Sequence, residues 1–122
     1  MLFRIDHQSP LSLSDQVAAS VRRALADGSA GPGERLPAAR ELATSLEINL
    51  HTVLRGYQKL RDEGLVELRR GRGAVISDGA GPGHGRLIER IHELAAEARA
   101  IGLSDEELLT LIRGTLAPDS TR

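Results

Sequence analysis

One helical pattern and one hairpin pattern follow each other directly in residues 49–77, which read NLHTVLRGYQKLRDEGLVELRRGRGAVIS. Asn49 can cap the start of a helix with its side-chain oxygen, and Gly64 suits the left-handed residue that ends one. The runs 65–69 and 74–77 then resemble short strands on either side of a glycine-containing turn. This stretch therefore predicts a helix with a β-hairpin immediately after it.

Two further helices are expected before this stretch. Residues 13–27 repeat apolar side chains at helical spacing, and Ser12 with Asp15 resembles a capping box at their start. The loop 29–37 contains two Gly and two Pro, and a second helix fits residues 38–46. Only a few residues separate the second helix from the third. The order helix, helix, turn, helix, hairpin predicts a winged helix-turn-helix.

A glycine-rich segment divides the chain. Residues 78–85 read DGAGPGHG and predict a Gly/Pro linker between a winged helix-turn-helix domain over 1–77 and a helical dimerisation tail over 86–122. The tail carries apolar residues at coiled-coil spacing on one helix, and a second helix opens at Ser104. The fold class expected is mainly α (α+β), and pairing with a second copy would cover the apolar residues of the tail. The residues expected to form this dimer are Leu87, Ile91, Leu94, Ala98, Ile101 and Ile112.

Composition restricts the function classes. The net charge is −1, but residues 1–77 hold 11 basic and 9 acidic side chains, whereas residues 78–122 hold 5 and 8. This asymmetry is expected if only the first part meets a polyanion. The chain has no Cys, which excludes disulfides and thiolate metal sites, and two aromatic residues are too few for base stacking on single strands. Without an apolar leader or a long apolar run, the sequence predicts a cytoplasmic protein with no membrane partner.

The third helix has two different faces. Val53, Tyr57 and Leu60 fall within about 40° of one another on a helical wheel, as a buried face requires. Polar side chains fall on the opposite side, where Arg suits guanine and Gln suits adenine in the major groove of DNA. An ordinary solvated face is the alternative. These polar residues are His51, Arg55 and Gln58.

The hairpin turn is strongly basic. Arg69, Arg70 and Arg72 alternate with Gly71 and Gly73 at its tip. Long cationic side chains on a thin turn can hold phosphates or enter the minor groove. A plain exposed turn is the alternative, and a nucleotide-binding loop is disfavoured because the Lys-Ser/Thr ending and a following helix are missing.

Three separated motifs resemble the GntR family of bacterial regulators. Residues 31–43, GPGERLPAARELA, resemble the family signature, and residues 64–75, GLVELRRGRGAV, resemble its wing. Between them, residues 49–60, NLHTVLRGYQKL, are similar to the third helix of the YtrA subfamily, whose members carry a short two-helix dimerisation tail. The resemblance implies a homodimeric repressor that binds double-stranded DNA. With the wing analysis above, the expected DNA-binding residues are Arg40, Asn49, His51, Thr52, Arg55, Arg70, Gly71 and Arg72.

Three residues depart from the family pattern. Ala38 stands where Ser is frequent, so the second helix lacks an N-cap hydroxyl, and Leu50 stands where the subfamily has Pro. Glu47 stands where Gly is common in the helix–helix turn. If that position needs a positive φ, Glu47 is strained.

Other sites have weaker support in the sequence. His84 and His92, with Glu89 or Glu93, are the best candidate metal ligands, but no zinc motif such as His-Glu-x-x-His is present. Glu106 and Glu107 form a carboxylate pair that helix-start charge explains better than catalysis. We therefore expect no enzyme activity, no cofactor and no metal, and the sequence identifies no small-molecule effector. A winged helix used only for protein contacts remains the alternative to a DNA-binding regulator.

Overall fold

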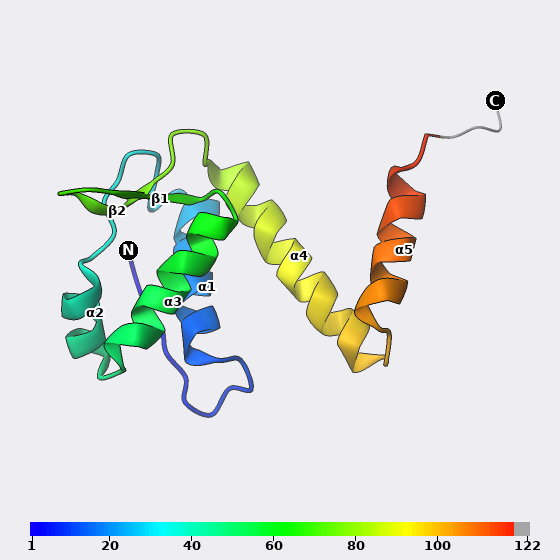
Figure 1. The fold of residues 1–122 in the computed structure, drawn as a ribbon, viewed down its shortest axis with the longest axis horizontal. Helices are drawn as coiled ribbons and strands as arrows, with labels where there is room; N and C mark the ends of the chain where they lie inside the picture. The colour runs from blue at the N-terminus through cyan, green and yellow to red at the C-terminus, as the bar shows by residue number, and fades with distance from the viewer. Residues whose placement is uncertain (119–122) are drawn as a thin grey trace. The chain divides into compact units, whose positions relative to one another are not determined.

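The computed structural model describes residues 1–118 and divides the chain into two compact units, Met1–Glu89 and Arg90–Arg122. In the first unit, three helices and a two-stranded hairpin follow one another, and α4 then begins (Figure 1). The second unit holds the rest of α4 and α5. The expected fold class, mainly α with a short β wing, is confirmed.

The first helix, α1, spans Leu13–Ala26. It begins where expected, because the Ser12 side chain accepts a hydrogen bond from the backbone N–H of Asp15. Asp27 is its C-cap, and Gly28 follows with a positive φ of 80°. The helix lies at the centre of the unit, with Val17, Val21 and Leu25 fully buried.

An N-terminal segment crosses α1, and Gln16 holds it there. The Gln16 side-chain oxygen accepts from the Asp6 N–H at 2.7 Å. Its amide nitrogen donates to the carbonyl oxygens of Asp6 at 3.0 Å and Leu11 at 2.9 Å. Phe3 and Ile5 pack against the core from this segment. The buried Gln16 amide therefore satisfies backbone groups that the segment could not pair by itself.

The helix α2 spans Ala39–Leu46, and α3 spans Leu50–Asp62. Ala38 occupies the N-cap of α2 and supplies no capping hydrogen bond. Glu47 caps the C-terminus in the left-handed region, at φ 56° and ψ 45°. Among the described residues it is the one non-glycine with positive φ, so the suspected strain at this turn is confirmed.

The wing pairs β1 (Val66–Arg69) with β2 (Gly73–Ile76) in antiparallel register, with Val66 opposite Ile76. The backbone of residues 33–36 runs beside β2, where the Leu36 N–H donates to the Ala74 carbonyl at 2.8 Å. β2 thus has a backbone partner on both of its edges, β1 on one and residues 33–36 on the other. Core side chains come from α1, α3, the loop before α2 and both strands, and the largest fully buried ones include Leu25, Leu36, Val53, Leu60, Leu65 and Ile76.

The predicted linker is wrong over its second half, because α4 spans Pro82–Ala100 and so begins inside residues 78–85. Proline suits the first turn of a helix, where its missing N–H would be unpaired anyway. Gly85 lies against α1, and a Cβ there would come within 2.9 Å of the Leu25 Cβ. The Arg86 guanidinium donates to the Ala26 carbonyl at 3.0 Å, at the C-terminal end of α1. The first turns of α4 therefore belong to the winged unit, which extends to Glu89 rather than ending at residue 77.

The buried side chain of Arg22 also links α1 to the end of α3 and to α4. Arg22 of α1 is 2% exposed. Its guanidinium pairs with both carboxylate oxygens of Glu63, each at 2.9 Å, and with Glu89 of α4 at 3.3 Å. Bidentate pairing satisfies a guanidinium that would otherwise be costly to bury.

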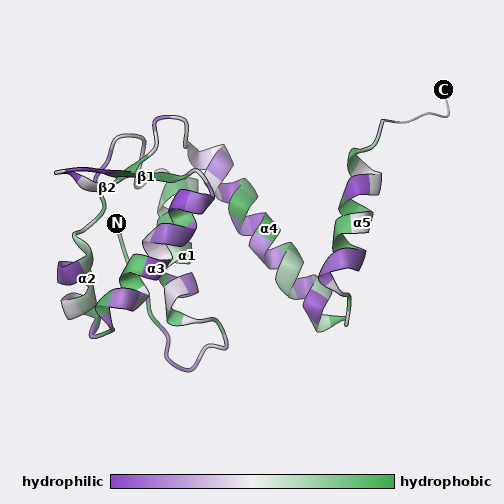
Figure 2. Cartoon of the chain, in the orientation of Figure 1, coloured by the Kyte–Doolittle hydropathy of each residue, from purple (hydrophilic) through white to green (hydrophobic). Residues whose placement is uncertain are grey.

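In the second unit, α4 ends at Ala100 and Gly102 follows with φ 83°. The helix α5 spans Asp105–Leu116 and opens with a complete capping box between Ser104 and Glu107. Hydrophobic and hydrophilic residues alternate along both helices (Figure 2). Among the residues expected to form the dimer, Ala98 is buried at 6% exposure and Ile112 is half-buried. The exposed members are Leu87, Ile91, Leu94 and Ile101.

Candidate nucleic-acid interface

The helix α3 sits close to α1 because one of its residues has no side chain. A Cβ at Gly56 would lie 2.9 Å from the Ser14 carbonyl oxygen and 2.9 Å from the Val17 Cγ1. Val53 and Tyr57 are buried beside it. The predicted inner face of α3 is therefore confirmed, and its opposite face is left to solvent.

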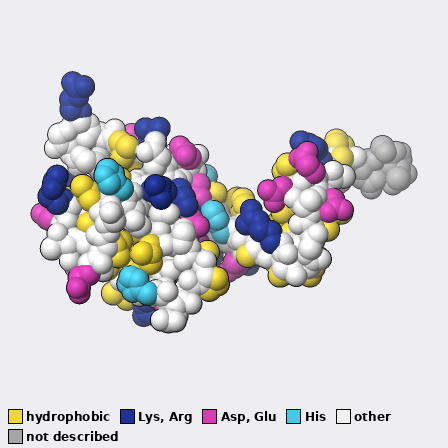
Figure 3. Space-filling view, turned by 60° about the horizontal axis from the view of Figure 1, so that its bottom comes forward, with side chains coloured by type: hydrophobic (Ala, Val, Ile, Leu, Met, Phe, Trp, Pro, Cys, Tyr) yellow, Lys and Arg dark blue, Asp and Glu magenta, His cyan; other side chains and the backbone are white. Residues whose placement is uncertain are grey.

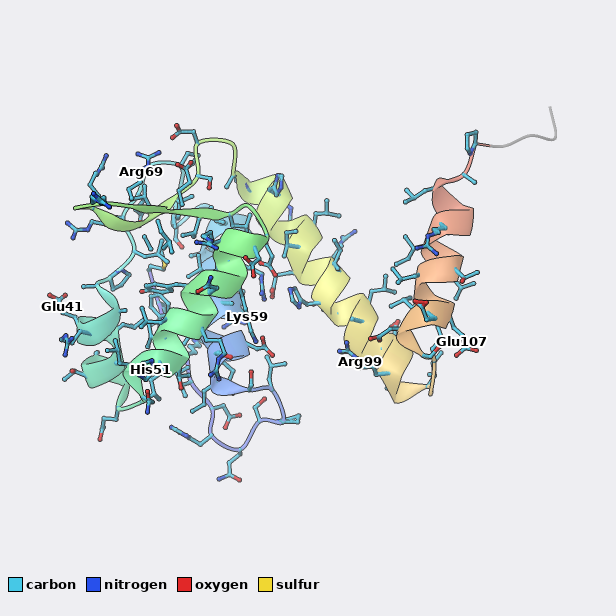
Figure 4. The ribbon with its side chains drawn as sticks, viewed as in Figure 1. Glu41, His51, Lys59, Arg69, Arg99 and Glu107 are labelled. Atoms are coloured by element: carbon cyan, nitrogen blue, oxygen red, sulfur yellow. The ribbon has the colours of Figure 1, made fainter. Side chains whose placement is uncertain are left out.

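His51 and Arg55 lie on the exposed face of α3, together with Gln58. His51 is in the first turn of the helix (Figure 4). Asn49 caps the same turn, because its side-chain oxygen accepts from the His51 N–H at 2.7 Å. That oxygen is occupied, so the Asn49 amide group is left to donate to a ligand. Thr52 is half-buried on the flank of the helix.

Arg40 projects from the first turn of α2 and is exposed. This helix packs on α3 through Leu42 and Ala43, which are buried at 6% exposure each. The Tyr57 hydroxyl donates to the Pro37 carbonyl at 2.7 Å, and this hydrogen bond ties α3 to the segment that leads into α2. Burial raises the pKa of the Tyr57 phenol, so it stays a neutral donor. The apolar spacing of α3 predicts Tyr57 in the core but carries no signal for this hydrogen bond.

The wing tip presents Arg70 and Arg72. Gly71 between them takes a positive φ of 80°, which the tight turn requires. Arg69 is committed elsewhere, since its guanidinium contacts Glu67 at 3.3 Å and Asp78 at 4.0 Å. Arg69 therefore already has carboxylate partners, whereas the Arg70 and Arg72 side chains have none among residues 1–118.

The positive charge of Lys59 on α3 is also neutralised by a partner within the fold. Its ammonium group pairs with Asp15 of α1. Burial disfavours ionisation of Asp15, but hydrogen bonds from Lys59 and Ser12 outweigh it and hold the pKa of the carboxyl below its ordinary value. This pair fastens α3 to α1 rather than serving a ligand.

Four predicted DNA-binding arginines keep free guanidinium groups. Across residues 1–118, none of these four side chains has a hydrogen-bond or ion-pair partner. They come from α2, α3 and the wing, and Lys and Arg side chains project from the outline of the winged unit in the space-filling view (Figure 3). Unpaired cations on protruding elements suit contact with phosphates or base edges. The four are Arg40, Arg55, Arg70 and Arg72.

The other candidate sites receive different roles. Within the described part of the chain, no three His, Asp or Glu side chains gather as a metal site would need. The Glu107 carboxylate accepts from the Ser104 N–H at 2.8 Å and so acts as a helix cap. None of the described helices combines the length and apolar character needed to cross a bilayer.

Comparison with known proteins agrees with this geometry. Residues 13–76 match the model of bacterial regulatory proteins, gntR family. The HTH-type transcriptional repressor YtrA of Bacillus subtilis is 33% identical over 112 residues, covering 88% of this chain and 86% of that protein. The HTH-type transcriptional regulator Rv1152 of Mycobacterium tuberculosis is 32% identical over 116 residues, covering 95% and 93%.

A solved structure supports the same assignment. YtrA from Sulfolobus acidocaldarius, a GntR-family transcription factor, superposes with a TM-score of 0.61 at 31% identity, covering 80% of this chain and 99% of that one. The sequence similarity, the fold and the exposed basic residues are thus all consistent with a DNA-binding protein of this family. The chain belongs to the gntR family of bacterial regulatory proteins and is a winged helix-turn-helix DNA-binding regulator of transcription.

Proposed function

We propose that the protein is a homodimeric repressor that binds an inverted-repeat operator. The observation that carries the proposal is the set of four unpaired arginines on α2, α3 and the wing, beside the exposed polar face of α3. In this assignment α3 enters the major groove, Arg55 and Arg40 contact base edges, and Arg70 and Arg72 hold phosphates. The name of the Bacillus subtilis relative, a transcriptional repressor, supports repression.

His51, Thr52 and Asn49 complete the proposed interface at the start of α3. His51 is exposed, and the Asn49 amide can donate to a phosphate or base. Gly71 allows the backbone of the wing tip to approach the duplex closely. Thr52 is half-buried on the flank of α3, and we assign its hydroxyl, a hydrogen-bond donor, to a phosphate contact.

The exposed apolar residues of α4 support a two-fold dimer. Leu87, Ile91 and Leu94 are 56%, 50% and 42% exposed in the single chain, and Ile101 is 75% exposed. Closed two-fold pairing is the commonest way to cover such a stripe. It would place two α3 helices on half-sites about one DNA turn, or a multiple of a turn, apart.

Selection of genomic fragments with the purified protein tests operator binding. A selected site should bind with a strong salt dependence, since each phosphate contact contributes about 0.9 to the slope of log affinity against log salt. Arg40→Ala and Arg55→Ala should each lower affinity by about 1–3 kcal/mol. Arg61→Ala is the matched control, because Arg61 is exposed on α3 but lies near its C-terminal end. Failure to enrich any site, or normal binding by both variants, refutes the proposal.

The dimer has its own test. Ile91→Asp should yield monomers by light scattering and lose operator binding at physiological salt, while the winged unit stays folded. Ala96→Asp is the control, because Ala96 is exposed on the opposite side of α4. A monomeric wild-type protein at tens of micromolar, or equal effects of both substitutions, would contradict dimerisation through this stripe.

A further inference from the structure

One apolar side chain stands among the polar residues of the proposed reading face. Leu54 of α3 is 44% exposed. It lies one helical turn after His51 and one turn before Gln58, both of which are exposed. Its neighbours Val53 and Tyr57 are buried and already supply the contact with the core. Leu54 therefore contributes its side chain to the surface of α3 rather than to the fold.

Leu54 also borders a shallow apolar groove of about 390 Å³. The groove lies between α3, the start of α2 and the wing, and its lining includes Pro37, Gln58 and Leu68. Arg35 lies at the same groove and is exposed. An apolar site with a cationic residue at its edge, continuous with the proposed DNA-binding face, suits a ligand that combines phosphates with a small apolar group.

Duplex DNA carries one such group in the major groove, the 5-methyl group of thymine. Polar side chains bond the other base-edge atoms there, whereas an aliphatic side chain gains only from contact with this methyl group. We propose that Leu54 is a specificity-determining residue that recognises the 5-methyl group of one thymine in each half-site. The inference rests on the proposed operator binding by α3.

Leu68 provides a matched comparison. It is 49% exposed and lines the same groove, but it belongs to β1 of the wing, where its Cα partner is Ala74. A wing reaches phosphates or the minor groove, and thymine presents no methyl group in the minor groove. The assignment therefore predicts sensitivity to the methyl group for Leu54 alone.

The experiment replaces thymine by deoxyuridine, one position at a time in both half-sites of a selected operator, and measures Kd with the full chain. This change removes the methyl group and keeps the hydrogen-bonding atoms of the base. Loss of one buried methyl group per half-site predicts about a fourfold weakening per half-site, or about fifteenfold for the dimer. Wild-type protein should show this loss at one symmetric position. Leu54→Ala should bind thymine and uracil operators equally there, and Leu68→Ala should keep the wild-type ratio.

The outcomes separate the two proposals. If wild-type protein tolerates uracil at every position, or if Leu54→Ala keeps the full sensitivity, the role of Leu54 is refuted while operator binding stands. If no operator is selected, operator binding itself fails. Thermal unfolding of Leu54→Ala, monitored by circular dichroism, should lie close to that of the wild type because Leu54 is 44% exposed and is not part of the buried core. If Leu54→Ala is fully folded and still shows the wild-type ratio of thymine-operator to uracil-operator affinity, the proposed role of Leu54 is refuted.

Discussion

Replacing Gly85 by Ala tests whether the first turns of α4 pack on α1. A Cβ at this position would lie 2.9 Å from the Leu25 Cβ and 3.0 Å from the Arg22 carbonyl oxygen, so the helices must move apart. Overpacking of this kind costs about 1–3 kcal/mol. The intrinsic preference of a helix for Ala over Gly offsets at most about 1 kcal/mol of this cost. We therefore expect Gly85→Ala to lower the free energy of unfolding by about 1 kcal/mol.

Gly83→Ala is the matched control. Gly83 lies in the same turn of α4, and a Cβ there meets no heavy atom of the described residues within 4 Å. This variant should therefore be more stable than the wild type by a few tenths to about 1 kcal/mol. Urea denaturation monitored by circular dichroism at one fixed protein concentration measures both, since the proposed dimerisation would make stability depend on concentration. A Gly85→Ala protein as stable as Gly83→Ala would refute the packing of α4 on α1.

Three further predictions concern the turn, the buried arginine and the α5 cap. Glu47→Gly should raise the free energy of unfolding by about 1 kcal/mol, because Gly adopts the φ of 56° without strain; an unchanged urea midpoint would contradict this. Glu63→Gln should cost about 2 kcal/mol in the same assay, and more than Glu89→Gln, because Glu63 holds Arg22 with two bonds rather than one. Hydrogen bonds from Ser104 lower the pKa of Glu107 below its ordinary 4.5, so the α5 cap is fully present above that pH and is lost as the pH falls through the lowered pKa. Residue-level NMR should show α5 fraying on acidification, and the same pH dependence in Glu107→Gln, which lacks the titrating carboxyl, would count against it.

Local signals predicted the winged unit well. Ser12, Asn49 and Gly64 mark helix ends through their own side chains or backbone freedom, and the structure places helix boundaries within about one residue of them. The strain at Glu47 also follows from local geometry. Each of these predictions needed only a few neighbouring residues.

The start of α4 escaped prediction because its cause is not local. Glycines in the sequence indicate flexibility, but Gly85 is required by the close approach of α1, which lies about sixty residues earlier. Pro82 was a usable signal, because proline at the first helical position is favoured. The burial of Arg22 was equally hidden, since its partner Glu63 is 41 residues away.

Pairing among side chains explains why the near-neutral net charge says little about DNA binding. In the winged unit, Arg22, Lys59 and Arg69 each have a carboxylate partner. These cations fasten α1 to α3 and α4, or stabilise the base of the wing, and their charge is largely cancelled where they stand. The excess of acidic side chains that makes the total negative lies in residues 78–122, which hold 5 basic and 8 acidic side chains. The arginines at the tips of α2, α3 and the wing keep their charge, so a chain with a net charge of −1 can still present a cationic surface to a duplex.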